Sequence, residues 1–339
     1  MPDKTLRSPR ELNAKTILKR LFGEYSYVVS FILIITIAVI VNPNFFRWRN
    51  FSNMFTQSAS TTGFIALGMT MVICAGQIDI SVGAQVAIIS GFGIEVLNTT
   101  QNIWIMLAFC LALGFVIGSF NGVLVAKGRM PAMIATLAVQ TSCRAIINHF
   151  GQGGPFSVAS GISTQPHYET FRRVANGSVR IFGYNLPYPM IMFIAAALLF
   201  GLIMQRTRLG KHIYAVGSSE IAAKMAGVNV DRTKIAVFAI TGLLCGFTSW
   251  VYSSKLMAVA AANAGSGFEM DAIAAVAIGG TAMSGGRGKI IGTFLGVLMF
   301  KMISNTLVAA QVPTFLTGAI SGAIIIIAVL LQSMRGRTK

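Results

Sequence analysis

The chain has 339 residues, of which 54% are hydrophobic and only 11% are charged. Soluble domains carry about 25% charged residues, so this composition excludes an ordinary soluble protein and indicates one that lies in a lipid bilayer. The formal net charge of +17 does not indicate nucleic-acid binding, because membrane proteins concentrate basic residues in the loops that stay in the cytoplasm.

Residues 1–24 are polar and basic, and no cleavage pattern of a secretory signal lies near the start. We therefore expect a cytoplasmic basic tail, followed by one transmembrane domain at 25–334 and a second basic tail at 335–339. Since a hydrocarbon core about 30 Å thick needs about 20 apolar residues per helix, the sequence predicts an all-α membrane helix bundle. Its ten predicted spans are 25–41, 55–75, 81–98, 102–126, 131–148, 188–205, 235–254, 268–283, 289–308 and 314–332.

The positive charges indicate the orientation of these spans. With ten crossings, most of the 27 Lys and Arg residues fall on the side of the N-terminal tail. Both termini are therefore predicted to be cytoplasmic. A miscount by one hairpin would leave eight spans with the same orientation.

Two long connections are predicted. The outer one, 149–187, contains GQGGPF and FGYNLPYP and serves either as a cover of the outer mouth or as a surface connector. The inner one, 206–234, contains a short helix of about seven residues. Ser218 or Ser219 suits its N-cap and Gly227 its end.

Ile221 and Met225 lie four residues apart, on one face of this short helix. A helix of this length is not stable alone in water. It therefore needs a partner, which is either the inner surface of the bundle or a separate soluble protein.

Four acidic residues lie at or within predicted spans: Asp79, Glu95, Glu269 and Asp271. An ionised Asp facing lipid costs roughly 2.5 to 3.5 kcal/mol, so such residues face a polar path, pair internally or cap a helix. The segment CAGQIDISVG, residues 74–83, predicts a break in the backbone. Asp79 is then either a pore-side residue or, with Ser81, a cap of the third span, and the residues favour the cap. Glu269 and Asp271 suit the N-terminus of the eighth span.

Further polar residues lie inside apolar spans, where they make hydrogen bonds between helices or line a solute path. The complete set proposed for a translocation path or helix break is Gln77, Asp79, Ser81, Asn121, Thr136, Gln140 and Asn305.

No enzyme site is predicted. The run GGRGK lacks the phosphate-loop pattern because Ile290 follows Lys289, and no nucleophile, base and orienting group occur together. The four cysteines and three histidines show no metal-ligand spacing, so neither a metal nor a directly bound cofactor is expected.

Four blocks, in order along nearly the whole chain, resemble the ribose-type permeases of binding-protein-dependent ABC importers. They are IDISVG (78–83), NGVLVAKGRMPAMIATL (121–137), TRLGKHIYAVGSSEIAAKMAGVNV (207–230) and DAIAAVAIGGTAMSGGRGKIIGT (271–293).

The resemblance implies a homodimeric permease in the bacterial inner membrane. Such a permease receives a monosaccharide, for example a ribose-like pentose, from a periplasmic sugar-binding protein, while a separate cytoplasmic ABC ATPase uses ATP and Mg. It also implies that an inner-loop helix docks on this ATPase. The matching positions are Ser218, Ser219, Glu220, Ile221, Ala222, Lys224, Met225 and Gly227.

One departure from the family pattern is Gln77, which stands where Gly usually precedes the IDLSVG motif, so the resemblance does not assign ribose itself. A proton- or ion-coupled secondary transporter using Asp79 or Glu95 is the alternative function, and a purely structural membrane protein is a third. Only the importer requires the short inner helix for ATPase contact.

Overall fold

The computed structural model describes residues 26–152, 154–159, 166–313, 316, 318–320, 322, 323 and 326. The predicted tails at 1–24 and 335–339 lie outside these residues, as does most of the predicted span 314–332.

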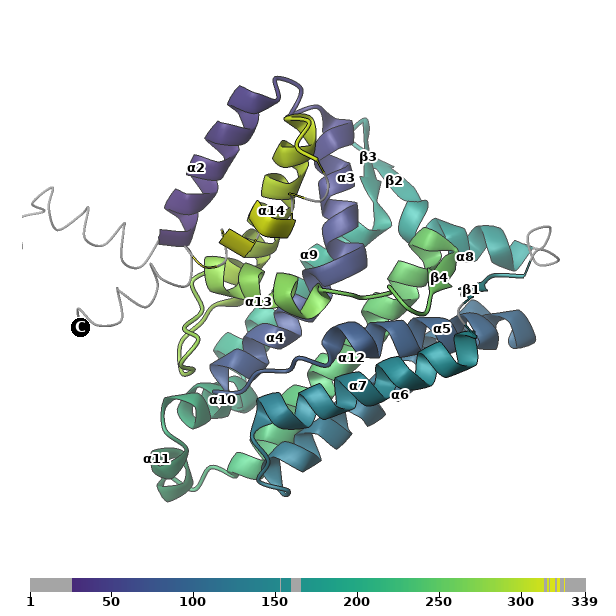
Figure 1. Cartoon of the computed structure of the whole chain (residues 1–339). Coiled ribbons are helices and arrows are strands. Elements are labelled where there is room, and N and C mark those ends of the chain that lie inside the picture. Colours follow the sequence, from purple (N-terminus) through teal and green to yellow (C-terminus); the bar gives the residue numbers. More distant parts are fainter. Residues whose placement is uncertain are drawn as a thin grey trace, which may run out of the picture.

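The described chain is a bundle of helices with four short strands (Figure 1). In chain order the elements are α2 (Ser26–Val41), α3 (Trp48–Ser58), η1 (Ala59–Gly63), α4 (Phe64–Cys74), α5 (Val82–Thr100), α6 (Ile103–Ala126), α7 (Ala132–Gly151), β1 (Pro155–Ser157), α8 (Pro166–Asn176), β2 (Ser178–Ile181), β3 (Tyr184–Pro187), α9 (Tyr188–Arg206), α10 (Arg208–Ser218), α11 (Glu220–Met225), α12 (Val230–Leu256), β4 (Ala258–Ala260), α13 (Phe268–Ile278) and α14 (Ile290–Ala309).

Six helices in the described part are long and apolar enough to cross a membrane: Trp48–Cys74, Val82–Thr100, Ile103–Ala126, Tyr188–Arg206, Val230–Leu256 and Ile290–Ala309. The prediction for 268–283 is wrong in length. α13 has 11 residues, which at 1.5 Å per residue cover about half of the hydrocarbon core. It ends because the chain turns at Gly280, whose φ is 84°.

The helix observed at the predicted span 55–75 is longer than predicted, because α3, η1 and α4 form one helix that begins at Trp48. Its π-helical turn lies where hydroxyl side chains bond to backbone carbonyl groups. Ser60 Oγ donates to Thr56 O at 2.7 Å and Thr61 Oγ1 donates to Gln57 O at 2.8 Å. Such bonds compete with the regular helical hydrogen bonds and favour a local deformation.

The most extensive contact between two helices of the described chain is that of α6 with α12. A methyl group on Gly118 would lie 2.9 Å from Gly242 Cα, and one on Gly246 would overlap Cys110 O. Glycines four residues apart therefore let the two backbones touch, which is a common way to pack helices in membranes.

The predicted outer loop 149–187 is ordered over its described residues, and it corrects the expectation of an all-α chain. β1 pairs antiparallel with β4, and β2 pairs with β3 in a hairpin. Phe182 and Gly183 form the hairpin turn with φ values of 48° and 84°, as a type I′ turn requires. These elements lie at the end of the bundle far from α11 (Figure 1).

Candidate functional site

The backbone breaks between α4 and α5, as the sequence predicts. Gln77 N–H donates to Val72 O at 3.0 Å and Gly76 N–H donates to Ile73 O at 2.9 Å, while Gly76 has a φ of 76°. This is a Schellman motif, which ends a helix by satisfying its last carbonyl groups. It turns the chain away from the α4 axis just before Asp79.

Ser81 is the centre of a buried polar cluster in this connection. Its hydroxyl donates to Asp79 Oδ1 at 2.6 Å and accepts from Gln85 Nε2 and Asn121 Nδ2, both at 2.8 Å. Thr136 joins from α7, because its Oγ1 accepts the Ile80 N–H at 3.1 Å. Asp79, Ser81, Gln85, Asn121 and Thr136 are all fully buried, and we call them the Ser81 cluster.

The predicted capping of α5 is wrong in its detail. Ser81 occupies the N-cap position, yet neither its side chain nor that of Asp79 accepts a helix N–H group. Asp79 Oδ1 instead accepts the Ser81 N–H at 2.9 Å. The reason is that a serine hydroxyl has one proton and two lone pairs, and here Asp79, Gln85 and Asn121 take all three.

Three acceptor atoms of the cluster are unpaired within the described part of the chain. Asp79 Oδ2, Gln85 Oε1 and Asn121 Oδ1 are buried and have no hydrogen-bond partner among the described residues. An unpaired buried acceptor costs free energy, whereas the three hydrogen bonds of the Ser81 hydroxyl stabilise this cluster.

The remaining residues of the predicted path do not join the cluster. Asn305 Nδ2 donates to Asn50 Oδ1 at 3.1 Å, between α14 and α3. Gln140 lies one turn beyond Thr136 on α7, and its Oε1 has no partner in the described structure. Gln77 instead makes a contact with Glu220 of α11. Glu95, which was considered only for the alternative function, is exposed. The predicted set is therefore four clustered residues and three separate ones.

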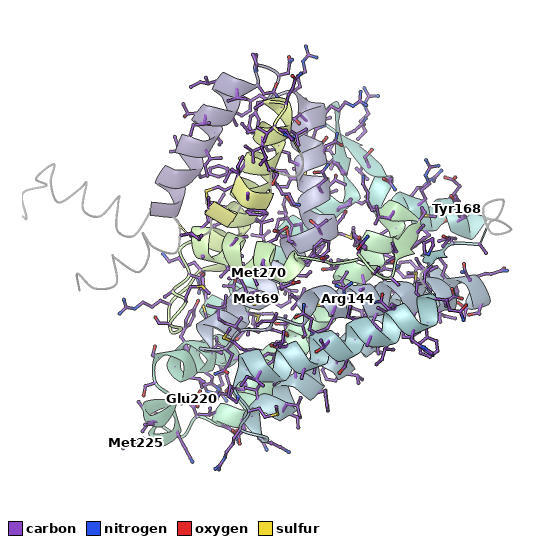
Figure 2. The ribbon with its side chains drawn as sticks, viewed as in Figure 1. Met69, Arg144, Tyr168, Glu220, Met225 and Met270 are labelled. Atoms are coloured by element: carbon purple, nitrogen blue, oxygen red, sulfur yellow. The ribbon has the colours of Figure 1, made fainter. Side chains whose placement is uncertain are left out.

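The sequence pattern did not single out Gln85 or Arg144, and it did not indicate where the side chain of Glu269 lies. Gln85 lies four residues after Ser81, so helical spacing would have found it. Arg144, near the centre of the view in Figure 2, donates from Nη1 to Ala264 O at 2.6 Å. A search for cations as well as acids inside the predicted spans would have found it.

Glu269 and Asp271 lie in the first turn of α13, but Gly267 is the N-cap and no side chain caps this helix. The predicted place of the two acids at the N-terminus of this helix is therefore confirmed, although neither of them is the N-cap residue. A methyl group on Gly83 would overlap Glu269 Oε2, so the carboxylate faces the first turn of α5. An anion is favourable there because a helix N-terminus carries partial positive charge.

The short inner helix is present as α11, six residues long. Ser219, not Ser218, caps it by accepting the Ala222 N–H at 3.2 Å, and Gly227 follows with a φ of 79°. Ala223 is buried against the bundle, whereas Ile221 and Met225 are 77% and 85% exposed. Figure 2 shows Met225 at the tip of the molecule. One face of α11 is thus packed and its apolar face is open.

Charged and polar contacts hold α11 in place. Glu220 Oε1 lies 2.6 Å from Lys234 Nζ on α12, and Gln77 Nε2 lies 3.5 Å from the same Glu220 oxygen. Beside α11 opens a cleft of about 1010 Å³, lined also by Lys127 and Arg129 of the connection between α6 and α7.

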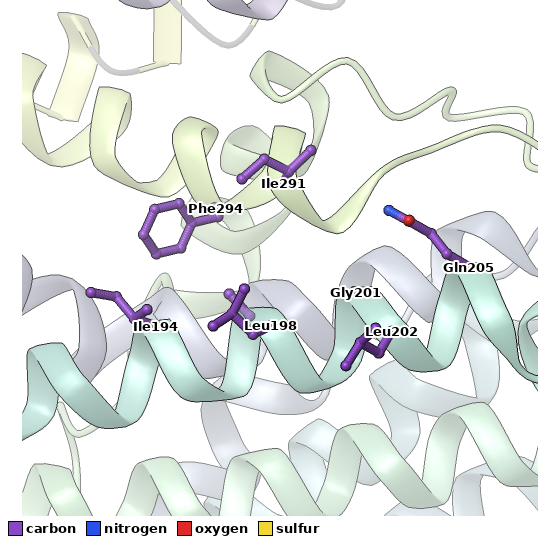
Figure 3. Close-up of a pocket in the computed structure, with 8 residues that line it drawn as sticks. Ile194, Leu198, Gly201, Leu202, Gln205, Ile291 and Phe294 are labelled. Atoms are coloured by element: carbon purple, nitrogen blue, oxygen red, sulfur yellow. The ribbon is translucent and has the colours of Figure 1, made fainter.

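A second, apolar groove of about 280 Å³ lies between α9 and the start of α14 (Figure 3). Its walls include Leu198 and Leu202, which are 66% and 60% exposed on the surface of the bundle, and Gln205 is the one side chain with a hydrogen-bonding group among its lining residues. The groove is therefore part of an apolar surface suited to lipid.

A family model described as branched-chain amino acid transport system / permease component matches residues 50–329. The ribose import permease protein RbsC of Haemophilus influenzae is 33% identical, covering 94% of this chain and 96% of that protein. The same-named protein of Bacillus subtilis is 37% identical, covering 89% and 90%.

The xylose transport system permease protein XylH of Haemophilus influenzae is 28% identical, covering 89% of this chain and 96% of that protein. No solved structure matches this chain. Together with the six long apolar helices, these matches place the chain in the inner membrane as a multi-pass protein. It belongs to the family of permease components of binding-protein-dependent transport systems that this family model describes.

Proposed function

We propose that this chain is the membrane-spanning permease subunit of an ABC importer that moves a monosaccharide from the periplasm to the cytoplasm. The relatives named above are permeases for ribose and xylose, which supports a sugar as the class of substrate. A periplasmic sugar-binding protein delivers the sugar, and a separate cytoplasmic ATPase uses ATP and Mg to drive its passage.

The observation that carries this proposal is the build of α11. A six-residue helix has too few turns to be stable alone, yet this one is capped by Ser219 and tied to α12 by Glu220 and Lys234. It presents Ile221 and Met225 to solvent. Apolar side chains on a rigid exposed helix are typical anchors for a groove in a partner protein.

In this arrangement α11 acts as a lever. Ile221 and Met225 enter a cleft of the ATPase, with Glu220 and Lys224 beside them as polar flanks. When the ATPase subunits close, the docked helix moves with them. The spans attached to it then change their tilt and exchange outward access for inward access.

The corresponding membrane topology has ten spans, with both termini and the loop 206–234 in the cytoplasm and the loop 149–187 outside. In this topology α13, with 11 residues, makes only about half of the eighth crossing, and the non-helical chain before it makes the rest. A second copy of the chain completes the path as a homodimer, which supplies two α11 helices for an ATPase dimer.

Copurification tests the docking of α11. The chain is expressed with its sugar-binding protein and ATPase, and Ile221→Asp is expected to abolish ATPase copurification and sugar uptake while membrane insertion stays intact. Phe182→Asp is the matched control, because Phe182 is 97% exposed at the opposite end. It should retain the ATPase. Undiminished copurification of the ATPase with Ile221→Asp would defeat the docking assignment.

The alternative of a proton- or ion-coupled transporter has weaker support. Glu95 is exposed, and the carboxylate of Asp79 is fully enclosed in the Ser81 cluster. Coupling of transport through either residue would not explain why α11 has an exposed apolar face.

A further inference from the structure

A junction of glycines lies at the end of α10, next to the start of α11, where three chain segments meet. The segments are the end of α4 at Cys74 and Gly76, the end of α10 at Gly217 and Ser218, and the glycine-rich loop before α14 at Gly285 and Gly286. We call these six residues the glycine junction. Gly286 N–H donates to Cys74 O at 3.0 Å, which joins the loop to α4.

Gly217 lies between the other two segments. A methyl group on Gly217 would overlap Cys74 O and would lie 2.7 Å from Gly286 N. A methyl group on Gly285 would lie 2.8 Å from Gly217 O and 2.9 Å from Gly76 Cα. The three backbones therefore touch with no side chain between them.

The loop can approach this closely because of its backbone conformation. Gly285 and Gly286 have φ values of 85° and 71°, which residues with side chains rarely adopt. A further contact comes from Tyr214 of α10, whose hydroxyl donates to Gly288 O at 2.8 Å. Burial raises the pKa of Tyr214 to about 12, and its neutral hydroxyl is the donor in this contact.

The junction connects α11 with the Ser81 cluster. Only Ser219 separates the end of α10 from α11, and Asp79 follows Gly76 by three residues. Contacts through long side chains can absorb a small displacement by changing rotamers. Close-packed backbones have no such freedom and shift together.

We propose that Gly217 is a positioning residue for transport, through which the glycine junction passes the movement of α11 to the connection between α4 and α5 and to the start of α14. This inference rests on the proposed function, since it requires an ATPase that moves α11. Gly217 itself touches neither the ATPase nor the sugar in this mechanism.

The test measures sugar uptake and ATP hydrolysis by the reconstituted permease, ATPase and binding protein. Gly217→Ala is expected to keep ATPase copurification but to lower sugar uptake per ATP hydrolysed by about tenfold, within the usual range of coupling between two sites. Gly201→Ala is the control, because a methyl group at that helical glycine would have no atom within 4 Å apart from the backbone of its own helix. It should keep the wild-type ratio. An unchanged ratio in Gly217→Ala would overturn the inference.

A cross-link provides a second test, which decides the matter if Gly217→Ala does not assemble. A methyl group on Gly286 would overlap Ser218 Oγ, and disulfides join Cβ atoms about 3.8 Å apart. The pair Ser218→Cys and Gly286→Cys should therefore form a disulfide on oxidation. If the segments move together, the reduced protein transports sugar and the oxidised protein transports it as fast. Loss of uptake on oxidation that reduction restores would overturn the inference.

These outcomes differ from failure of the proposed function. If the wild-type chain neither binds the ATPase nor imports a sugar, the proposed function fails. If the wild type does both and the ratio is unchanged in Gly217→Ala, only the role of the glycine junction fails.

Discussion

Replacing Ser81 by alanine tests the hydrogen bonding of the Ser81 cluster independently of any function. The substitution removes one hydroxyl from a fully buried site. It leaves Gln85 Nε2 and Asn121 Nδ2 without the acceptor that lies 2.8 Å from each of them. Asp79 Oδ1 loses one of its two bonds but keeps the Ser81 N–H.

The expected loss of stability follows from the two amide groups that are left without an acceptor. Each buried polar group left unsatisfied costs about 1 to 3 kcal/mol, so the free energy of unfolding should fall by roughly 2 to 6 kcal/mol. With an unfolding entropy of about 2.1 cal/mol/K per residue, this lowers the midpoint temperature of the whole chain by roughly 3 to 8 °C. The assay is thermal unfolding of the purified permease in detergent.

Ser58→Ala is the matched control, because Ser58 is also fully buried but its hydroxyl has no partner among the described residues. Its removal should leave the midpoint unchanged or raise it slightly, since an unpaired polar group is lost. Equal midpoints for Ser81→Ala and Ser58→Ala would refute the reasoning.

Three further predictions concern the N-cap of α11, the side chain of Asp79 and the packing of α6 against α12. Ser219→Ala should weaken ATPase binding about fivefold, since an N-cap contributes about 1 kcal/mol, whereas Ser219→Asp should retain binding. Equal ATPase affinities of these two variants in a pull-down titration would contradict the capping role of Ser219. Asp79→Asn should retain more sugar uptake than Asp79→Ala, because an amide oxygen can still accept the two bonds from Ser81, and equal loss of uptake would count against that role. Gly118→Ala should lower the free energy of unfolding by about 1 to 3 kcal/mol through overpacking, because its methyl group would overlap Phe238 O. A thermal unfolding midpoint equal to that of Gly201→Ala would argue against close contact of α6 and α12.

Features that depend on near neighbours along the chain could be predicted from the sequence. The end of α4 at Gly76 and the short helix after Ser219 follow from glycine and capping residues at fixed offsets, and the structure has both. Six of the ten predicted spans are helices long and apolar enough to cross a membrane in the described chain, and these follow from composition in the same way. Ends of helices were less predictable, since α3 extends to Trp48 through contacts that no local pattern encodes.

The candidate site was only partly predictable. Asp79, Ser81, Asn121 and Thr136 could be picked out as polar residues in apolar surroundings, but so could Asn305, which lies elsewhere. Arg144, which is half-buried, is a cation inside a predicted span, where a cation is as costly as an acid. Burial cost identifies which residues need a partner, but it does not identify the partner.

The sequence by itself determined that this protein lies in a membrane, that a capped short helix follows α10, and that its blocks resemble sugar permeases. Only the tertiary structure decided that Ser81 is shared between Asp79, Gln85 and Asn121, and that Gly217 lies between Cys74 and Gly286. The physical reason is distance along the chain. Periodicity and capping act within a few residues, whereas Cys74, Gly217 and Gly286 come together only when whole helices pack.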